Sequence, residues 1–377
     1  MVLPVLIIGA GLGGVCLAQA LRKNNIPFQL FEQDGRQNFR SQGYRLRVNQ
    51  YGVDALHEAL SPEVFDVFER TCAASAGFGV SLKPNGSLPP PGRGGPPPFM
   101  GQSYTVDRST FRAALLTGLE DSVHFGKTLE HYVIADDKVT AHFADGTTAV
   151  GALLVGADGV RSHVRRQYIP NFPALDTGMR IIFGRTPITP EFLAATPEEY
   201  HQGMSLISDP EKMPDPYMYW VITVRRAAIP FSDERSWNVT PEEAASLAEK
   251  LTETWDPAIR KVVTMQDRSK SSIRSILSAM PDMPSWEPSD RVTLVGDAIH
   301  VMPPTGAMGA NTALRDAADL ARRIADAGGA EGAVGQGLRE YEAELWSFAK
   351  KAIELSWQGG FKSFGLQPQE KCERITL

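Results

Sequence analysis

The N-terminal segment carries the feature that most limits how this chain can fold. A short β-branched run over residues 2–8 is followed at once by Gly9, Gly11 and Gly14, and the apolar spacing over 15–23 is that of a helix. In such a strand, turn and helix, the first glycine allows the tight turn and the second lets backbone approach a pyrophosphate. The third lets the helix pack closely. The helix N-terminus then offers N–H groups and a positive dipole to phosphate.

An acidic residue stands where such a turn needs it. A second short strand is predicted over 28–31, and it ends at Glu32, 23 residues after Gly9. That spacing is close to the about 20 residues expected of the acid that holds a ribose hydroxyl. Strand, helix, strand and acid together predict a βαβ unit that binds a dinucleotide. This pattern alone does not choose between NAD and FAD.

A second candidate segment lies late in the chain. Asp297 follows a predicted buried strand over 292–295, where its carboxylate can accept a ribityl or ribose hydroxyl. A turn rich in Pro and Gly then leads through Gly309, Ala310 and Asn311 into a predicted amphipathic helix over 312–327. That helix N-terminus suits a developing negative charge on a ring. His300 is predicted to be a turn histidine held by local bonds.

A third segment follows an apolar strand predicted over 153–155. Asp158 and Gly159 form a turn signal there, and Arg161, Arg165 and Arg166 come directly after it. These arginines could meet phosphate, or they could form a solvated basic turn.

The order of elements predicts an α/β fold of about two domains from 377 residues. Parts of a nucleotide-binding domain are expected at 1–70, 104–170 and 286–335. A Pro/Gly-rich excursion covers 71–103, a sheet-rich substrate domain 171–285, and a C-terminal helix and tail 336–377. Strands at 123–125, 132–135 and 138–144 are expected to alternate as antiparallel neighbours.

Composition excludes several function classes. The net charge is −6 and the chain has no basic block, which argues against nucleic-acid binding. Three widely spaced cysteines and scattered histidines predict neither disulfides nor a metal site. The apolar N-terminus lacks a basic stretch, and no run reaches the ~18 apolar residues of a membrane span. We therefore expect a cytoplasmic protein that acts on a small molecule.

The three segments, in this order, resemble single-component (group A) FAD-dependent monooxygenases of the aromatic-hydroxylase type. Residues 9–32 match the family's FAD fingerprint, 156–165 its DG motif and 296–316 its GD motif. The stretch 104–112 is similar to the segment whose arginine, here Arg108, packs beside the flavin. The stretch 41–46 looks most like fungal secondary-metabolite members, whose second FAD contact falls there; this implies Gly43 and Arg45 as further cofactor residues.

The resemblance implies a Rossmann-like FAD-binding domain of the GR2 type, interrupted by an α+β substrate domain. It also implies that NADPH or NADH reduces FAD, that O₂ adds at flavin C4a, and that the hydroperoxide passes one oxygen to substrate. An apolar, aromatic or indole-like substrate is expected. Many relatives have Gly-Gln where this chain has Ala307 and Met308. Met308 is expected to remove a polar side chain near the flavin ring.

The insert is expected to set substrate specificity. Strand alternation puts Tyr217, Tyr219 and Val221 on one face, which could line an aromatic pocket or form ordinary sheet core. Related fungal enzymes carry an active-site Arg and Tyr in this insert, which implies Arg180 and Tyr219 as catalytic residues.

Other functions stay open at this point. A flavin-dependent halogenase shares the FAD fold, but its Trp-x-Trp-x-Ile-Pro motif is absent, since Trp220 is followed by Val-Ile-Thr. An FAD-dependent dehydrogenase or reductase and a non-enzymatic redox-sensing partner remain. Oxygen consumption separates the monooxygenase from these last two.

Overall fold

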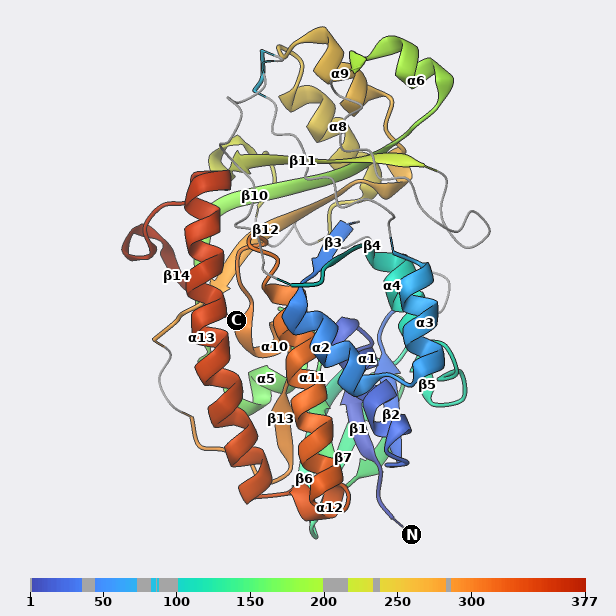
Figure 1. Ribbon diagram of the computed structural model, residues 1–377. Coiled ribbons are helices and arrows are strands. Elements are labelled where there is room, and N and C mark those ends of the chain that lie inside the picture. Colours follow the sequence, from blue (N-terminus) through green and yellow to red (C-terminus); the bar gives the residue numbers. More distant parts are fainter. Residues whose placement is uncertain are drawn as a thin grey trace.

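The protein consists of a lower body built on a parallel sheet and an upper antiparallel sheet (Figure 1). The computed structural model describes residues 2–35, 45–72, 83–85, 87, 101–198, 216–232, 238–282 and 286–377. Among the described helices, none has the length and apolarity needed to cross a membrane.

Five parallel strands form the lower sheet in the order β13-β9-β1-β2-β5. They are β1 (Val5–Ile8), β2 (Phe28–Glu32), β5 (Val123–Phe125), β9 (Leu153–Gly156) and β13 (Val292–Leu294). The first βαβ unit is thus formed as expected. The prediction that 123–125 pairs as an antiparallel strand was wrong, because β5 lies parallel beside β2. It follows the helix α4 (Arg108–Leu115), and a helical crossover returns the chain in the same direction.

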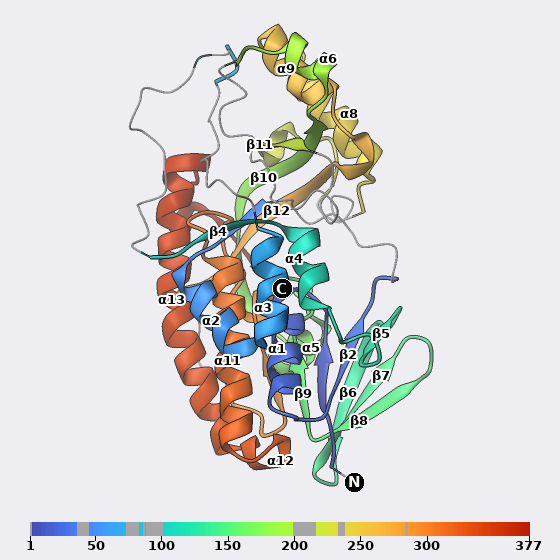
Figure 2. The same cartoon turned by 45° about the vertical axis from the view of Figure 1, so that its right-hand side comes forward.

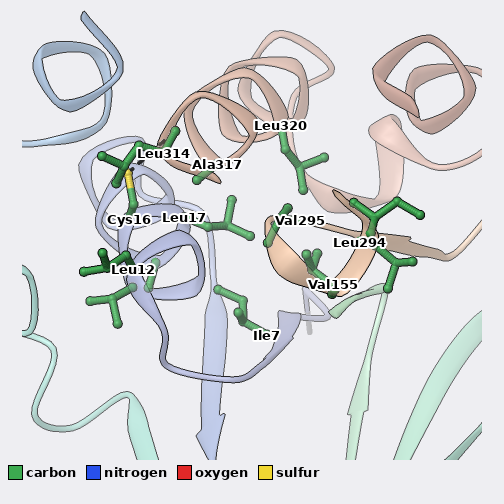
Figure 3. Close-up of a cluster of buried hydrophobic side chains, with 14 of the residues drawn as sticks. Ile7, Leu12, Cys16, Leu17, Val155, Leu294, Val295, Leu314, Ala317 and Leu320 are labelled. Atoms are coloured by element: carbon green, nitrogen blue, oxygen red, sulfur yellow. Dashed lines mark hydrogen bonds between the residues drawn. The ribbon is translucent and has the colours of Figure 1, made fainter. Parts of the chain in front are cut away.

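Helices cover one face of this sheet. They include α1 (Leu12–Lys23), α2 (Gln50–Ala59), α11 (Gly309–Asp326) and α13 (Gln336–Phe364). Figure 3 shows the core where α1 and α11 meet the strands, with Leu17, Leu314 and Val155 among its side chains. Gly13 faces Ala313 across this contact, where a Cβ at position 13 would lie 3.4 Å from Ala313 Cβ, in ordinary van der Waals contact. Burial of these apolar side chains stabilises the layer that carries the glycine turn.

A small antiparallel sheet covers the other face (Figure 2). It contains β6 (Leu129–Ala135), β7 (Lys138–Phe143) and β8 (Thr148–Gly151). Val139, Ala141 and Phe143 alternate inward from β7 and are buried against the parallel sheet. The helix α5 (His163–Tyr168) packs beside them.

The upper sheet is formed by the insert. Its order is β11-β10-β12, with β10 (Pro173–Pro187), β11 (Tyr217–Arg225) and β12 (Ser272–Ala279). The helices α6 (Pro190–Ala195), α8 (Pro241–Leu251) and α9 (Pro257–Thr264) lie on its upper side in Figure 1. A strand from the C-terminal tail, β14 (Glu373–Thr376), also pairs with β10. The tail therefore adds an edge strand to this sheet, which the sequence did not predict.

The two layers meet at a two-stranded ribbon, β3 (Arg45–Val48) and β4 (Tyr104–Asp107), which lies below the upper sheet (Figure 1). The remaining helices of the body are α3 (Pro62–Arg70), α10 (Asp297–His300) and α12 (Ala330–Ala333). The helix α13 begins at Gln336, within the predicted C-terminal segment, and continues to Phe364 through Gly359 and Gly360. Glycine at position 359 lets α13 lie close to Thr305, because a Cβ there would lie 3.0 Å from Thr305 Cβ.

Candidate functional site

The glycine turn is built by close approach of backbone to backbone. Gly9 has φ +105°, and a Cβ there would lie 2.4 Å from the Ala157 carbonyl oxygen. A Cβ at Gly14 would lie 2.0 Å from the Gly9 oxygen. At Gly11 the nearest such atom is 3.9 Å away, and Gly11 starts α1 without a side-chain cap. The turn therefore leaves room and N–H donors for a phosphate at Gly11.

Glu32 ends β2 beside this turn and is 7% exposed. Its carboxylate accepts from the Ala10 N–H at 3.0 Å, the Asp34 N–H at 2.9 Å and Arg112 Nη2 at 3.0 Å. Arg112 also donates to the Ala10 carbonyl. These bonds hold the carboxylate in one orientation, ready for a hydroxyl. Arg112 was not predicted as a site residue, although it lies four residues after Arg108 on the same helix face.

Asp158 follows β9 and lies against Gly9, where a Cβ would be 2.8 Å from the Asp158 Cα. Its Oδ2 accepts from the His163 and Val164 N–H groups, which holds the start of α5. Its Oδ1 is buried and has no hydrogen-bond partner within the described residues. Burial raises the pKa of this carboxyl. This unsatisfied acceptor beside the glycine turn fits a ligand whose hydroxyl group donates a hydrogen bond to it.

Arg165 does not reach a phosphate, contrary to one of the two expectations for this basic segment. It is fully buried; Nη1 donates to the Ala298 oxygen at 2.8 Å and Nη2 to the Val160 oxygen at 2.7 Å. Burial lowers the pKa of this guanidinium to about 10. The side chain instead ties the Asp158 segment to the start of α10.

Asp297 is the first residue of α10 and is exposed, whereas the three residues after it are buried. His300 lies beneath, with Nε2 2.5 Å from Asp316 Oδ2, and Asp316 also accepts from the Gly296 N–H at 3.0 Å. His300 is held by a hydrogen bond as predicted, but the partner lies on α11, 16 residues along the chain, and not in the local turn. Burial lowers the pKa of His300, but the nearby Asp316 carboxylate outweighs it, so the pKa is raised. This pair fixes the turn that presents Asp297.

The first turn of α11 contains Gly309, Ala310 and Asn311 and has no side-chain cap. Asn311 is almost fully buried: Nδ2 donates to the Arg47 and Ala307 oxygens, and Oδ1 accepts from the Asn49 N–H at 3.0 Å. The amide therefore joins α11 to the β3 strand. Any contact of this turn with a cofactor would come from backbone N–H groups.

Ala307 and Met308 form the turn before α11. Met308 is 2% exposed and packs into the main core, and its effect on the surroundings of a flavin ring stays a prediction. Ala307 has φ +53°, a left-handed conformation that glycine adopts more readily. Its carbonyl oxygen is held by the Asn49 and Asn311 side chains.

Three predicted site residues come together from three elements. Burial lowers the pKa of Arg108, at the start of α4, and the Asp297 carboxylate and the Tyr219 phenol act in the opposite direction. Arg108 of α4 therefore lies within electrostatic range of Asp297 in α10 and of Tyr219 in β11.

Arg180 and Tyr219 are not brought together. Tyr219 pairs with Arg185, and its ring is stacked 6.1 Å from Phe183 on the face toward the lower body. Arg180 pairs with Val224, on the face toward the helices α8 and α9. It is 1% exposed, and both terminal nitrogens bond the Asp176 carboxylate. Arg180 and Tyr219 therefore lie on opposite faces of the upper sheet, and a buried ion pair occupies the guanidinium of Arg180; the catalytic role of each stays a prediction.

Gly43 lies outside the described residues, while Arg45 lies over the Tyr217 ring at 5.6 Å. Tyr217 shares the face of Tyr219, as strand alternation predicted. Sequence reasoning missed Arg185, on the same face as Tyr219, because nothing in the insert marked the register of β10 against β11.

The chain matches two known families. Residues 7–71 match the NAD(P)-binding Rossmann-like domain, and residues 100–356 match the FAD binding domain. "Dual O-methyltransferase/FAD-dependent monooxygenase elcB" of Phaeosphaeria nodorum is 36% identical over 100% of this chain, which covers 48% of that protein. "FAD-dependent monooxygenase phnB" of Penicillium herquei is 28% identical over 94% of this chain and 90% of its own length.

A solved structure of similar fold is Klebsiella pneumoniae HpxO with FAD and uric acid. It has a TM-score of 0.70 and 19% identity, and the match covers 96% of this chain and 89% of that one. The chain spans about half the length of the elcB-type relatives. It belongs to the FAD binding domain family. The resemblance to FAD-dependent monooxygenases, including fungal secondary-metabolite ones, and the Rossmann-like fold class are both confirmed.

Proposed function

We propose that this chain is an FAD-dependent monooxygenase that uses NADPH or NADH and O₂ to insert one oxygen atom into an apolar, aromatic or indole-like small molecule. The observation that carries the proposal is that Arg108 lies within electrostatic range of Asp297 and of Tyr219, where the hydrogen bond from Tyr217 to Asp107 joins the upper sheet to the lower body. It joins a cofactor segment to the insert expected to bind substrate. When bound, FAD supplies the oxygen chemistry; the protein binds, orients and excludes water.

The two ends of FAD are assigned to two groups of residues: the glycine turn with Glu32, and Asp297 with the first turn of α11. The turn at Gly9, Gly11 and Gly14 with the N-terminus of α1 takes the pyrophosphate, and Glu32 takes a ribose hydroxyl. On the flavin side, Asp297 accepts a ribityl hydroxyl, and the first turn of α11 directs N–H groups at the ring. Asp158 Oδ1 supports this assignment. It is buried beside the glycine turn without a hydrogen-bond partner among the described residues, so it can accept a bond from a further hydroxyl of the cofactor.

The substrate pocket is assigned to the lower face of the upper sheet. Phe183 and Tyr219 present stacked rings there, and Val221, which pairs with Phe183, is 38% exposed. This apolar wall has the Tyr219 phenol and the Arg185 guanidinium at its edge, which suits an aromatic ring that carries few polar groups. The O-methyl transfer named for the longer relatives is not assigned here, since the family matches in this chain concern the nucleotide and FAD domains.

The test is a screen of aromatic compounds that follows NADPH and NADH consumption, with mass spectrometry of the products. We expect the purified protein to be yellow, to carry non-covalent FAD, and to give a product heavier by one oxygen atom. A product that has lost hydrogen without gaining oxygen would assign the protein to the dehydrogenases instead. An apoprotein that binds NAD but ignores FAD would reject the cofactor assignment.

A further inference from the structure

Tyr217, at the start of β11, joins the upper sheet to the lower body. It is 4% exposed, and its hydroxyl donates to Asp107 Oδ2 at 2.5 Å. The guanidinium groups of Arg45 and Arg185 lie 5.6 and 5.3 Å from the centre of its ring. Burial and the Asp107 carboxylate raise the pKa of the Tyr217 phenol, so it keeps its proton and donates. One side chain of the insert is thus held by both β3 and β4.

The Asp107 carboxylate serves two segments at once. Oδ1 accepts from the Thr110 N–H at 3.0 Å and caps the N-terminus of α4, while Oδ2 takes the Tyr217 hydroxyl. Arg45 lies directly opposite Asp107 in the ladder of β3 and β4. The bond from Tyr217 therefore reaches the ribbon and the first turn of α4 together.

The residue after Asp107 is Arg108, the first of α4. Tyr219 lies two positions after Tyr217, on the same face of β11. Tyr217 thus contacts Asp107 by a hydrogen bond, and Tyr219 lies within electrostatic range of Arg108, the next residue of the chain. Because Asp107 and Arg108 are adjacent, loss of the Tyr217 bond is expected to affect the position of Arg108.

We propose that Tyr217 is a positioning residue: through its hydrogen bond to Asp107 it holds the start of α4, and with it Arg108, in the position that the proposed function needs for FAD binding. The inference rests on the proposed function, because it assigns Arg108 to the FAD that this function requires. It concerns cofactor binding, which can be measured without any turnover.

The test is a double-mutant cycle on FAD affinity, measured by titrating apoprotein with FAD and following flavin fluorescence. The proteins are the wild type, Tyr217→Phe, Arg108→Ala and the double variant. We expect Tyr217→Phe to weaken FAD binding about tenfold in the wild type, the scale of a hydrogen bond to a charged group. In the Arg108→Ala background we expect it to weaken binding by less than about twofold, because the group it positions is gone.

Tyr168→Phe is the matched control. The Tyr168 hydroxyl also donates to a buried carboxylate, Glu342, at 3.1 Å, but beside the edge strand β13 of the lower sheet, where Thr293 donates to the same carboxylate. We expect this variant to lower the unfolding temperature and to bind FAD within about twofold of the wild type. A comparable loss of FAD affinity in Tyr168→Phe would mean that general destabilisation explains the effect, and would overturn the proposal.

Asp107→Ser covers the case in which Tyr217→Phe does not fold. Serine still caps α4 but is too short to accept from Tyr217. We expect the same loss of FAD affinity, again confined to proteins that retain Arg108. Wild-type affinity in this variant, or equal losses with and without Arg108, overturns the positioning role alone. An apoprotein that takes up no FAD overturns the proposed function and this inference with it.

Discussion

Ala307 holds a conformation that favours glycine, so Ala307→Gly is expected to stabilise the protein. Its φ is +53°, and its carbonyl oxygen is fixed by two amide side chains, which glycine would leave in place. The left-handed conformation costs a residue with a Cβ about 1–2 kcal/mol. Glycine loses about 0.5–1 kcal/mol more conformational freedom on folding. The free energy of unfolding should therefore rise by about 0.5–1 kcal/mol.

Urea unfolding of the apoprotein, followed by tryptophan fluorescence, measures this change. Ala343→Gly is the control, since Ala343 is an exposed residue inside α13 and glycine there should cost about 1 kcal/mol. The two substitutions are chemically identical and should shift the midpoint in opposite directions. Destabilisation by Ala307→Gly to the extent seen for Ala343→Gly would refute the argument from backbone strain.

Three further substitutions test the site and its support. Asp297→Ala should weaken FAD binding by about 1.5–3 kcal/mol, the loss of a charge-assisted bond, and an unchanged flavin titration would remove Asp297 from the site. The pKa of His300 is raised in the folded state by Asp316, so its contribution is complete below the unfolded value of about 6.5 and is lost as pH rises through the folded value. His300→Gln should abolish that decline in apoprotein unfolding experiments. Arg180→Ala should cost about 3–5 kcal/mol by stranding Asp176, yet leave FAD affinity unchanged; normal stability would contradict the buried ion pair.

The cofactor half of the fold was predictable because its signals are local. Gly9 and Gly14 occupy positions where a Cβ would strike backbone, and such constraints leave glycine in the sequence. Glu32 was found by spacing alone. Arg112 was missed because its role depends on where α4 lies against the glycine turn, a tertiary contact with no sequence pattern of its own.

The insert was harder to predict for the same reason. The face of Tyr217 and Tyr219 follows from strand period, but the register of β10 against β11 does not, and that register sends Arg180 to the opposite face. A bulge between Asp176 and Arg180 adds to the difficulty. The strand β14 has only four residues, and most of them are polar and exposed. Its sequence therefore gives no strand signal, and only the pairing with β10 makes it a strand.

Oxygen transfer is tested most directly with isotopically labelled O₂. The FAD-loaded protein would be mixed with NADPH or NADH, a set of apolar aromatic and indole-like compounds and ¹⁸O₂ in ordinary water, and the products analysed by mass spectrometry. The proposed function predicts a product that carries one labelled oxygen atom, with the second atom of O₂ released as water. A product whose new oxygen comes from the solvent, or one that has lost hydrogen and gained no oxygen, would contradict it.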